Sequence, residues 1–218
     1  MPAAKRCHGG VCMGCLVDPV AKLWTSEPNM VRWDEARGGY PAPPSRTAAG
    51  AVIFAGSFNP PHHGHAEVMR YLAGAHESVH VVVGVNPSKV YLISAEDRKA
   101  ILEGIARGIG AQNVRVHVWG GAIFRLARQL GARAFYRGIR SWEEDGKAER
   151  HLEVQNLCWP PLASCMAPMP TYYVQGPPQY NGVSSTLLRE RLAAGERIDD
   201  LVPAGVAEQV RTVFARSC

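Results

Sequence analysis

Short apolar runs alternate with segments of helical periodicity along most of this chain. The predicted strands lie at residues 51–55, 80–85, 114–119, 134–136 and 168–174. The predicted helices lie at residues 64–72, 94–106, 122–130, 147–157 and 184–194. Continuous apolar runs such as 51–55 are typical of strands covered on both faces of a parallel sheet. The alternation therefore predicts an α/β protein, a Rossmann-like doubly wound parallel sheet with helices on both faces.

The first fifty residues show no sustained period and end in a stretch rich in glycine and proline at 38–50. Such a composition is typical of a linker. It predicts two parts: residues 1–50 as a flexible, cysteine-containing N-terminal extension, and residues 51–218 as the folded domain. Cys7, Cys12 and Cys15 lie beside His8 with spacing that resembles a metal site. Adjacent Cys7 and His8 would chelate one ion only with strain, so a tail without zinc is the favoured interpretation.

Composition narrows the class of partner. The chain has 218 residues, 46% hydrophobic and 20% charged, which is ordinary for one globular domain. Its net charge of +5 is spread along the sequence without a Lys/Arg-rich block, so phosphorylated small molecules are favoured over nucleic acid. No apolar run approaches the roughly 20 residues that a membrane span needs. We therefore expect a cytoplasmic protein that binds neither membranes nor nucleic acid.

The strand predicted at 51–55 leads directly into Gly56-Ser-Phe-Asn-Pro-Pro-His-His-Gly-His65. Gly56 lets a ligand come close to the backbone because it has no Cβ. The two prolines force a turn before the next helix, so His65 is expected near that helix's N-terminus, where free N–H groups favour an anion. His62 and His65, three residues apart, can then face the same side. This pattern predicts a polyphosphate site.

A second, distant segment reads Val183-Ser-Ser-Thr-Leu-Leu-Arg189. Ser184 or Ser185 can cap the helix predicted there, while Ser185 and Thr186 offer hydroxyl groups and Arg189 follows about one turn later. Taken with the first segment, this one indicates a nucleotide site.

These two segments resemble the two signatures of the nucleotidylyltransferase superfamily, whose members transfer AMP or CMP from a nucleoside triphosphate. Three blocks between them, at residues 81–89, 94–98 and 135–140, resemble phosphopantetheine adenylyltransferases in order and spacing. The resemblance covers residues 51–214. It implies transfer of AMP from ATP to 4′-phosphopantetheine, giving dephospho-CoA and pyrophosphate in coenzyme A biosynthesis. It also implies a homo-oligomer and a requirement for Mg²⁺, held mainly by the phosphates because the sequence offers no carboxylate cage.

The resemblance also assigns roles to individual residues. His65 would contact the α-phosphate, and Lys89 and Arg140 complete the catalytic set. The implied ATP-binding residues are Gly56, Ser57, Phe58, His62, Gly64, His65, Gly138, Ile139, Arg140, Glu149, Ser184, Ser185, Thr186 and Arg189. The implied residues for the acceptor are Ser57, Lys89, Ile123, Arg137 and Asn156. Glu149 and Asn156 align with the family only if one residue is inserted after Arg140.

Two alternatives stay open from the sequence. Phosphopantetheine adenylyltransferases of bacteria usually have threonine where this chain has His62, and histidine there resembles the nicotinamide mononucleotide (NMN) adenylyltransferases. A non-catalytic nucleotide-binding module is the second alternative. The presence of the full set, His65, Lys89, Arg140, Ser185 and Arg189, favours an enzyme.

Overall fold

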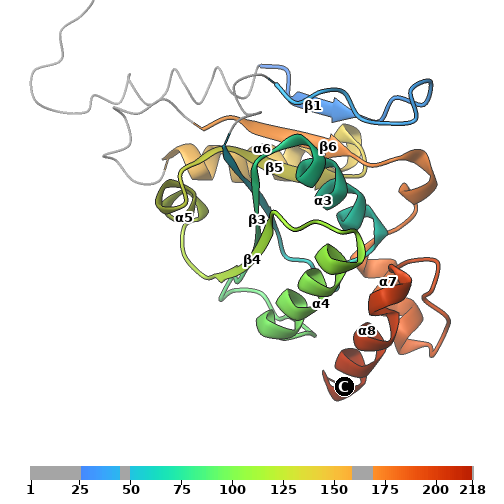
Figure 1. Ribbon diagram of the computed structural model, residues 1–218. Helices are drawn as coiled ribbons and strands as arrows, with labels where there is room; N and C mark the ends of the chain where they lie inside the picture. Colours follow the sequence, from blue (N-terminus) through green and yellow to red (C-terminus); the bar gives the residue numbers. More distant parts are fainter. Residues whose placement is uncertain (1–25, 45–49, 159–168, 218) are drawn as a thin grey trace, which may run out of the picture.

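A computed structural model describes residues 26–44, 50–158 and 169–217, and only the backbone of residues 154–158. Its strands are β1 (Asn29–Arg32), β2 (Ala51–Gly56), β3 (Ser78–Gly84), β4 (Val114–Trp119), β5 (Ala132–Ile139) and β6 (Thr171–Gln175). They form one sheet in the order β1-β6-β5-β2-β3-β4, and every neighbouring pair is parallel (Figure 1). The predicted fold class, a Rossmann-like doubly wound sheet, is confirmed.

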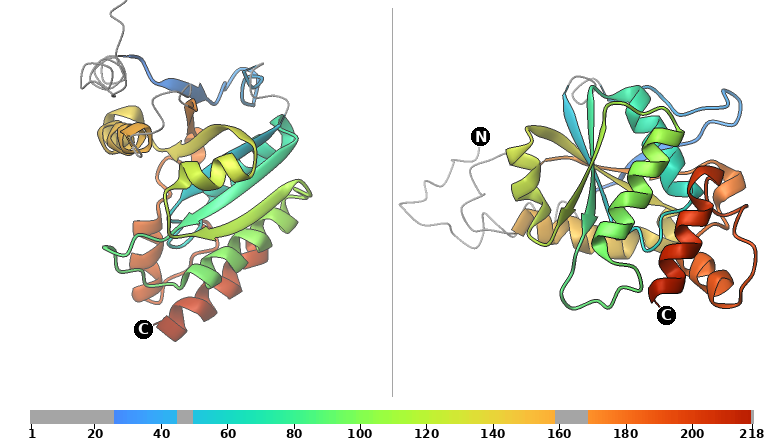
Figure 2. Two further views of the ribbon diagram at one scale, coloured as in Figure 1. Left: turned by 90° about the vertical axis from the view of Figure 1, so that its left-hand side faces the viewer. Right: turned by 60° about the horizontal axis from the view of Figure 1, so that its bottom comes forward.

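Helices cover both faces of this sheet. They are α3 (His63–Ala75), α4 (Ala95–Gly108), α5 (Ile123–Gln129), α6 (Trp142–Cys158), α7 (Ser185–Ala193) and α8 (Ala204–Ser217), with a short 3₁₀ turn η2 (Pro178–Tyr180). Figure 2 shows α5 and α6 on one side of the sheet and α4 and α8 on the other. None of the helices in the described ranges is long and apolar enough to cross a membrane.

Alternation along β2 explains the two layers. Val52 and Phe54 pack into the larger core cluster with α3, α4 and α8, whereas Ile53 and Ala55 pack into the smaller cluster with α5. All four side chains are at most 4% exposed. Because successive side chains of a strand point to opposite faces, a continuous apolar run is what a strand covered on both sides requires.

The predicted domain boundary at residue 51 needs correction. Strand β1, inside the predicted extension, pairs with β6 from Asn29↔Tyr172 to Arg32↔Gln175 and buries Val31. Tyr40 continues this attachment, with its ring centroid 4.6 Å from that of Tyr71 in α3. A four-residue strand with polar ends has too little periodicity to be recognised alone, and its partner lies more than 100 residues away.

The order of the strands places a crevice at the centre of the sheet. From β2 the chain crosses to β3 on one side, and from β5 it crosses to β6 on the other. Ligands of open α/β sheets bind at such a switch point, beyond the carboxyl ends of the strands. Strand β2 ends at Gly56, where the first predicted phosphate-binding segment begins, and the neighbouring β5 ends at Ile139, just before Arg140, so both lie at this crevice.

Candidate functional site

The two distant sequence segments meet at the crevice. The hydroxyl of Ser185 donates to the carbonyl of Pro60 over 2.8 Å, and Arg189 Nη1 donates to the carbonyl of Asn59 over 2.7 Å. Arg189 also donates from Nη2 to the Thr186 hydroxyl over 3.1 Å. The N-terminus of α7 is therefore fixed to the turn that follows β2.

Helix α7 begins as the sequence predicted. The side chain of Ser184 accepts a hydrogen bond from the Leu187 amide over 3.1 Å and so caps the helix. The cap leaves the first turn of α7, with the Ser185 and Thr186 amides, facing the crevice region as potential anion donors.

His62 and His65 lie against each other at the start of α3, with ring centroids 3.8 Å apart. The backbone N–H of His62 donates to Nδ1 of His65 over 3.2 Å. Because that N–H can only donate, Nδ1 of His65 accepts, and a neutral His65 carries its proton on Nε2. His65 can thus present an N–H donor to a phosphate oxygen.

Both histidines are held in the neutral form. Burial lowers the pKa of His62 to about 4, with a smaller contribution from His63. Burial also lowers the pKa of His65 well below its ordinary value, and the neighbouring His62 and Arg137 lower it further. In neutral His65 the acceptor nitrogen Nδ1 is already engaged by the His62 amide, so Nε2–H acts as a hydrogen-bond donor.

The space beside Gly56 and Gly64 is filled by the protein's own side chains. A Cβ on Gly56 would lie 2.8 Å from Cζ of Phe58, and one on Gly64 would lie 3.1 Å from Cε1 of His62. The expectation that these glycines leave room for a ligand is therefore corrected: they leave room for Phe58 and His62. Phe58 has φ of 48°, a strained value for a bulky residue, and its ring packs edge-on to His65 at 4.9 Å.

Phe58 and Ile139 cannot offer side chains to a nucleotide. Phe58 is 2% exposed and Ile139 is 7% exposed, so both belong to the core. Their predicted role in ATP binding is limited to their backbone groups. Ser57, in contrast, is exposed at the crevice, and its hydroxyl is accessible.

Lys89 lies in the loop between β3 and α4, exposed to solvent. Its amide donates to the Asn86 carbonyl over 3.0 Å, and the Asn86 side chain accepts from the Ser88 amide over 2.9 Å. Tyr91 Oη accepts from the Asn86 amide over 3.1 Å and closes the turn. This folded loop holds Lys89 beyond the carboxyl end of β3, the strand that pairs with β2.

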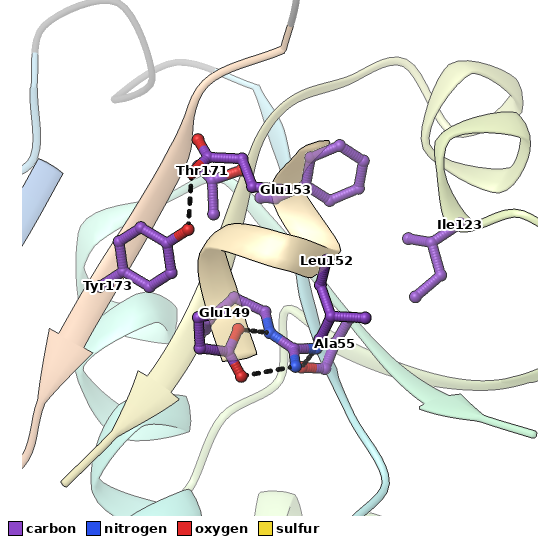
Figure 3. A pocket seen from close by; sticks show the side chains of 9 residues that line it. Ala55, Ile123, Glu149, Leu152, Glu153, Thr171 and Tyr173 are labelled. Atoms are coloured by element: carbon purple, nitrogen blue, oxygen red, sulfur yellow. Dashed lines mark hydrogen bonds and ion pairs between the residues drawn. The ribbon is translucent and has the colours of Figure 1, made fainter. Parts of the chain in front are cut away.

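Two of the five residues predicted for the acceptor line a pocket on the α6 side of the sheet (Figure 3). Ile123 and Arg137 line it, and the floor is apolar because Ala55 and Phe135 contribute to it. Glu149 lines the same pocket and forms a bidentate ion pair with Arg137, at 2.7 Å and 2.9 Å. The structure therefore places Glu149, predicted on the ATP side, beside the residues predicted for the acceptor.

Glu153 and Tyr173 also line this pocket, and the sequence indicated neither of them as site residues. The Glu153 carboxylate accepts a hydrogen bond from the Tyr173 hydroxyl over 2.7 Å (Figure 3). It also forms an ion pair with Arg150 Nη1 at 2.8 Å. The period of α6 could have placed Glu149 and Glu153 on one face, since they are four residues apart. Nothing in the sequence alone indicated that Tyr173 on β6 would be the partner of Glu153.

Arg140 follows β5 and is half-exposed. It pairs with Glu144 at 2.9 Å and with Asp145 at 2.7 Å, both from the first turn of α6. The Asp145 carboxylate raises the pKa of Arg140. These exposed pairs are weak enough for a phosphate to replace them.

Within the described residues, Lys89, Arg98 and Arg189 form no ion pair, and each lies on an element that borders the crevice. Arg98 is almost fully buried, at 1% exposed, and its role was not assigned from the sequence. Three uncompensated cations and two neutral imidazoles make a region suited to a polyphosphate anion.

Two predictions concern residues outside the described part of the structure. Asn156 was predicted to bind the acceptor, but only the backbone of α6 is described at that position. The cluster of Cys7, Cys12 and Cys15 lies before the first described residue. Among the residues that are described, no group of three or more His, Cys, Asp or Glu side chains could hold a metal ion.

Comparison with known proteins agrees with this geometry. Residues 53–191 match the family model "Cytidylyltransferase-like". A protein of Rubrobacter xylanophilus named phosphopantetheine adenylyltransferase is 30% identical over 76% of this chain and 96% of its own length. A protein of the same name from Micrococcus luteus is 32% identical over 71% of this chain and 93% of its own length. One from Brucella ovis is 31% identical over 75% of this chain and 97% of its own length. With both nucleotide-binding segments on one crevice and the match spanning both, the chain belongs to the cytidylyltransferase-like family.

Proposed function

We propose that this protein is a phosphopantetheine adenylyltransferase, which transfers AMP from ATP to 4′-phosphopantetheine and releases pyrophosphate and dephospho-CoA. The observation that carries the proposal is the pair of hydrogen bonds from Ser185 and Arg189 to the turn at Asn59 and Pro60. They put α7 and the histidines of α3 on one crevice. The similarity to enzymes of that name over most of the chain supports the choice of acceptor.

The reaction needs positioning and charge compensation rather than a protein nucleophile. An oxygen of the acceptor's phosphate attacks the α-phosphorus of ATP in line, and pyrophosphate leaves. Nε2–H of His65 donates to an α-phosphate oxygen as charge develops there. Lys89 holds the acceptor's phosphate, while Arg189 and the N-terminus of α7 bind the leaving phosphates.

The donor set also fits a requirement for Mg²⁺ supplied with the nucleotide. Glu149 and Asp145, the carboxylates nearest the predicted ligands, are engaged by Arg137 and Arg140. The phosphates of ATP would therefore provide most of the ligands of the ion. When bound, Mg²⁺ neutralises charge on the leaving pyrophosphate.

The pocket of Ile123, Arg137 and Glu149 would take the acceptor. Its floor of Ala55 and Phe135 suits the uncharged part of a pantetheine chain, and Arg137 borders the crevice through its hydrogen bond to the Ala55 carbonyl at 2.8 Å. The NMN alternative, raised by His62, is not favoured, because the similar proteins carry the phosphopantetheine name.

The deciding experiment measures pyrophosphate release by the purified protein with ATP, Mg²⁺ and one acceptor at a time. Turnover with 4′-phosphopantetheine, and none with NMN, would support the proposal. Turnover with NMN alone would replace it with the NMN alternative. ATP binding without turnover on either acceptor would favour a nucleotide-binding module.

Three expectations from the sequence stay predictions. They are assembly into a homo-oligomer, a cytoplasmic location and the absence of nucleic-acid binding. Light scattering tests the first, cell fractionation the second and a mobility-shift assay at physiological salt the third.

A further inference from the structure

Arg98 is the most deeply buried charged side chain that the proposed mechanism leaves without a role. It lies in the first turn of α4, is 1% exposed, and forms no ion pair with any described residue. A buried cation without a counter-charge is costly, so its hydrogen bonds must serve a purpose that an apolar side chain could not.

The guanidinium group of Arg98 connects two loops of the site. Nη1 donates to the carbonyl of Ser57 over 2.5 Å, in the loop after β2. Its Cζ lies 4.2 Å from the centroid of the Tyr91 ring, in the loop after β3 that carries Lys89. Nε donates to the Ser94 carbonyl over 3.3 Å, which keeps the fork in one orientation.

Each loop is then fixed further by bonds of its own. Tyr91 Oη accepts from the Asn86 amide, at the base of the turn that presents Lys89. Between the loops, Asn59 Oδ1 accepts from the amide of buried Ile93 over 3.3 Å. Arg98 and Asn59 are thus two links between the ATP-side loop and the acceptor-side loop.

We propose that Arg98 is a positioning residue that holds the Ser57 loop and the Lys89 loop in register, so that the two phosphate groups bind side by side. This inference rests on the proposed function for its kinetic part. The planar guanidinium group can link the two loops, because one face stacks on the Tyr91 ring while one edge donates to the Ser57 carbonyl. A lysine could keep the charge but could not do both.

The test uses Arg98→Met, Arg98→Lys and Tyr91→Phe, with Arg107→Lys as the control at an exposed arginine of the same helix. Hydrogen exchange of the Ile93 and Asn86 amides is compared with that of Val82 in the core of β3. Arg98→Met should speed exchange at Ile93 and Asn86 by about tenfold or more while Val82 changes less, since local opening is selective. In Arg98→Lys, exchange at Ile93 and Asn86 should be faster than in the unaltered protein but slower than in Arg98→Met. In Arg107→Lys, exchange at both amides should equal that of the unaltered protein.

Kinetics give a second readout. Arg98→Met should raise the KM of both ATP and the acceptor and lower kcat/KM by about 10- to 100-fold, because the reacting groups lose alignment. Tyr91→Phe keeps the ring but loses the bond to Asn86, so it should raise the KM of the acceptor alone.

Two results would overturn the inference. One is equal acceleration of exchange at Ile93, Asn86 and Val82, which would mean a general loss of stability. The other is unchanged exchange at Ile93 in Arg98→Met. If Arg98→Met does not fold, Arg98→Lys decides, because unchanged exchange at Ile93 and Asn86 in that variant would also overturn it. Failure of the proposed function would show separately, as absent turnover in the unaltered protein, and the exchange data would still decide the role of Arg98.

Discussion

Arg189 of α7 donates a hydrogen bond to the carbonyl oxygen of Asn59, 130 residues earlier in the chain, over 2.7 Å. This contact joins the second predicted nucleotide-binding segment to the turn that leads to His62 and His65. It leaves the charge of Arg189 unpaired within the described residues, next to the N-terminus of α7.

Arg189→Met should therefore weaken ATP binding. A hydrogen bond to a charged group contributes about 1.5–3 kcal/mol, so we expect the KM of ATP to rise by about 10- to 100-fold. Arg191→Met is the matched control, since Arg191 lies two residues along the same helix and pairs with Asp200 at 2.7 Å. Equal effects of the two substitutions on the KM of ATP would contradict the assignment.

His65→Ala should lower kcat by about a hundredfold or more, the usual loss for one donor to the transition state. The far-UV circular dichroism should not change. His63→Ala is the control, because the His63 ring stacks on Tyr180 at 5.0 Å and faces a different pocket. Nearly full turnover of the His65 variant would remove His65 from the mechanism.

Glu149→Gln should raise the KM of the acceptor and lower stability. The ion pair with Arg137 is largely buried, with side chains 14% and 23% exposed, so removing one partner leaves a poorly solvated charge. We expect a loss of about 1–3 kcal/mol in urea unfolding. Glu144→Gln breaks an exposed pair with Arg140 and should cost less than about 1 kcal/mol. A Glu149 variant as stable as the Glu144 variant would show that the buried pair does not matter.

Stability should fall as the pH falls from 7 to 5. The pKa of His62 is lowered from 6.5 to about 4 by burial, so the unfolded chain takes up a proton in this window and the folded protein does not. Stability therefore rises with pH here, and His62 alone accounts for about 1.5 kcal/mol between pH 6.5 and pH 5. His65, whose pKa is also lowered, acts in the same direction.

Urea unfolding at several pH values checks this, with His62→Asn for comparison. The variant cannot take up that proton, so its stability should depend less steeply on pH. Identical pH dependence of the two proteins would mean that His62 is not held neutral.

Gly56→Ala should disturb the site, because its Cβ would lie 2.8 Å from the buried ring of Phe58, which in turn packs on His65. We expect a loss of about 1–3 kcal/mol from overpacking, together with reduced kcat. Gly74→Ala is the control: that glycine lies in α3 with nothing within 4 Å of its Cβ position. It should be neutral or stabilise the helix by up to about 1 kcal/mol. Thermal unfolding and turnover are measured on both variants. If Gly56→Ala has the same stability and turnover as Gly74→Ala, the interpretation is wrong.

Most of the strand and helix pattern was predictable, because it depends on short-range periodicity. The strand predicted at 114–119 coincides with β4. Ser94, the first residue of the helix predicted at 94–106, caps α4 and accepts from the Asp97 amide over 3.0 Å. Strand β1 and helix α8 were not predicted. Each is recognised through partners far along the chain, β6 for the strand and α4 for the helix.

The features of the candidate site also divide into local ones, which the sequence predicts, and long-range ones, which it does not. The sequence alone determined which segments carry the chemistry, since glycines, histidines and a capped helix at set spacings are local features. Only the tertiary structure decided how they are used: that Glu149 faces Arg137, and that Arg98 reaches both Ser57 and Tyr91. Those relationships depend on which strands become neighbours, and strand order is set by the packing of the whole sheet rather than by any one segment.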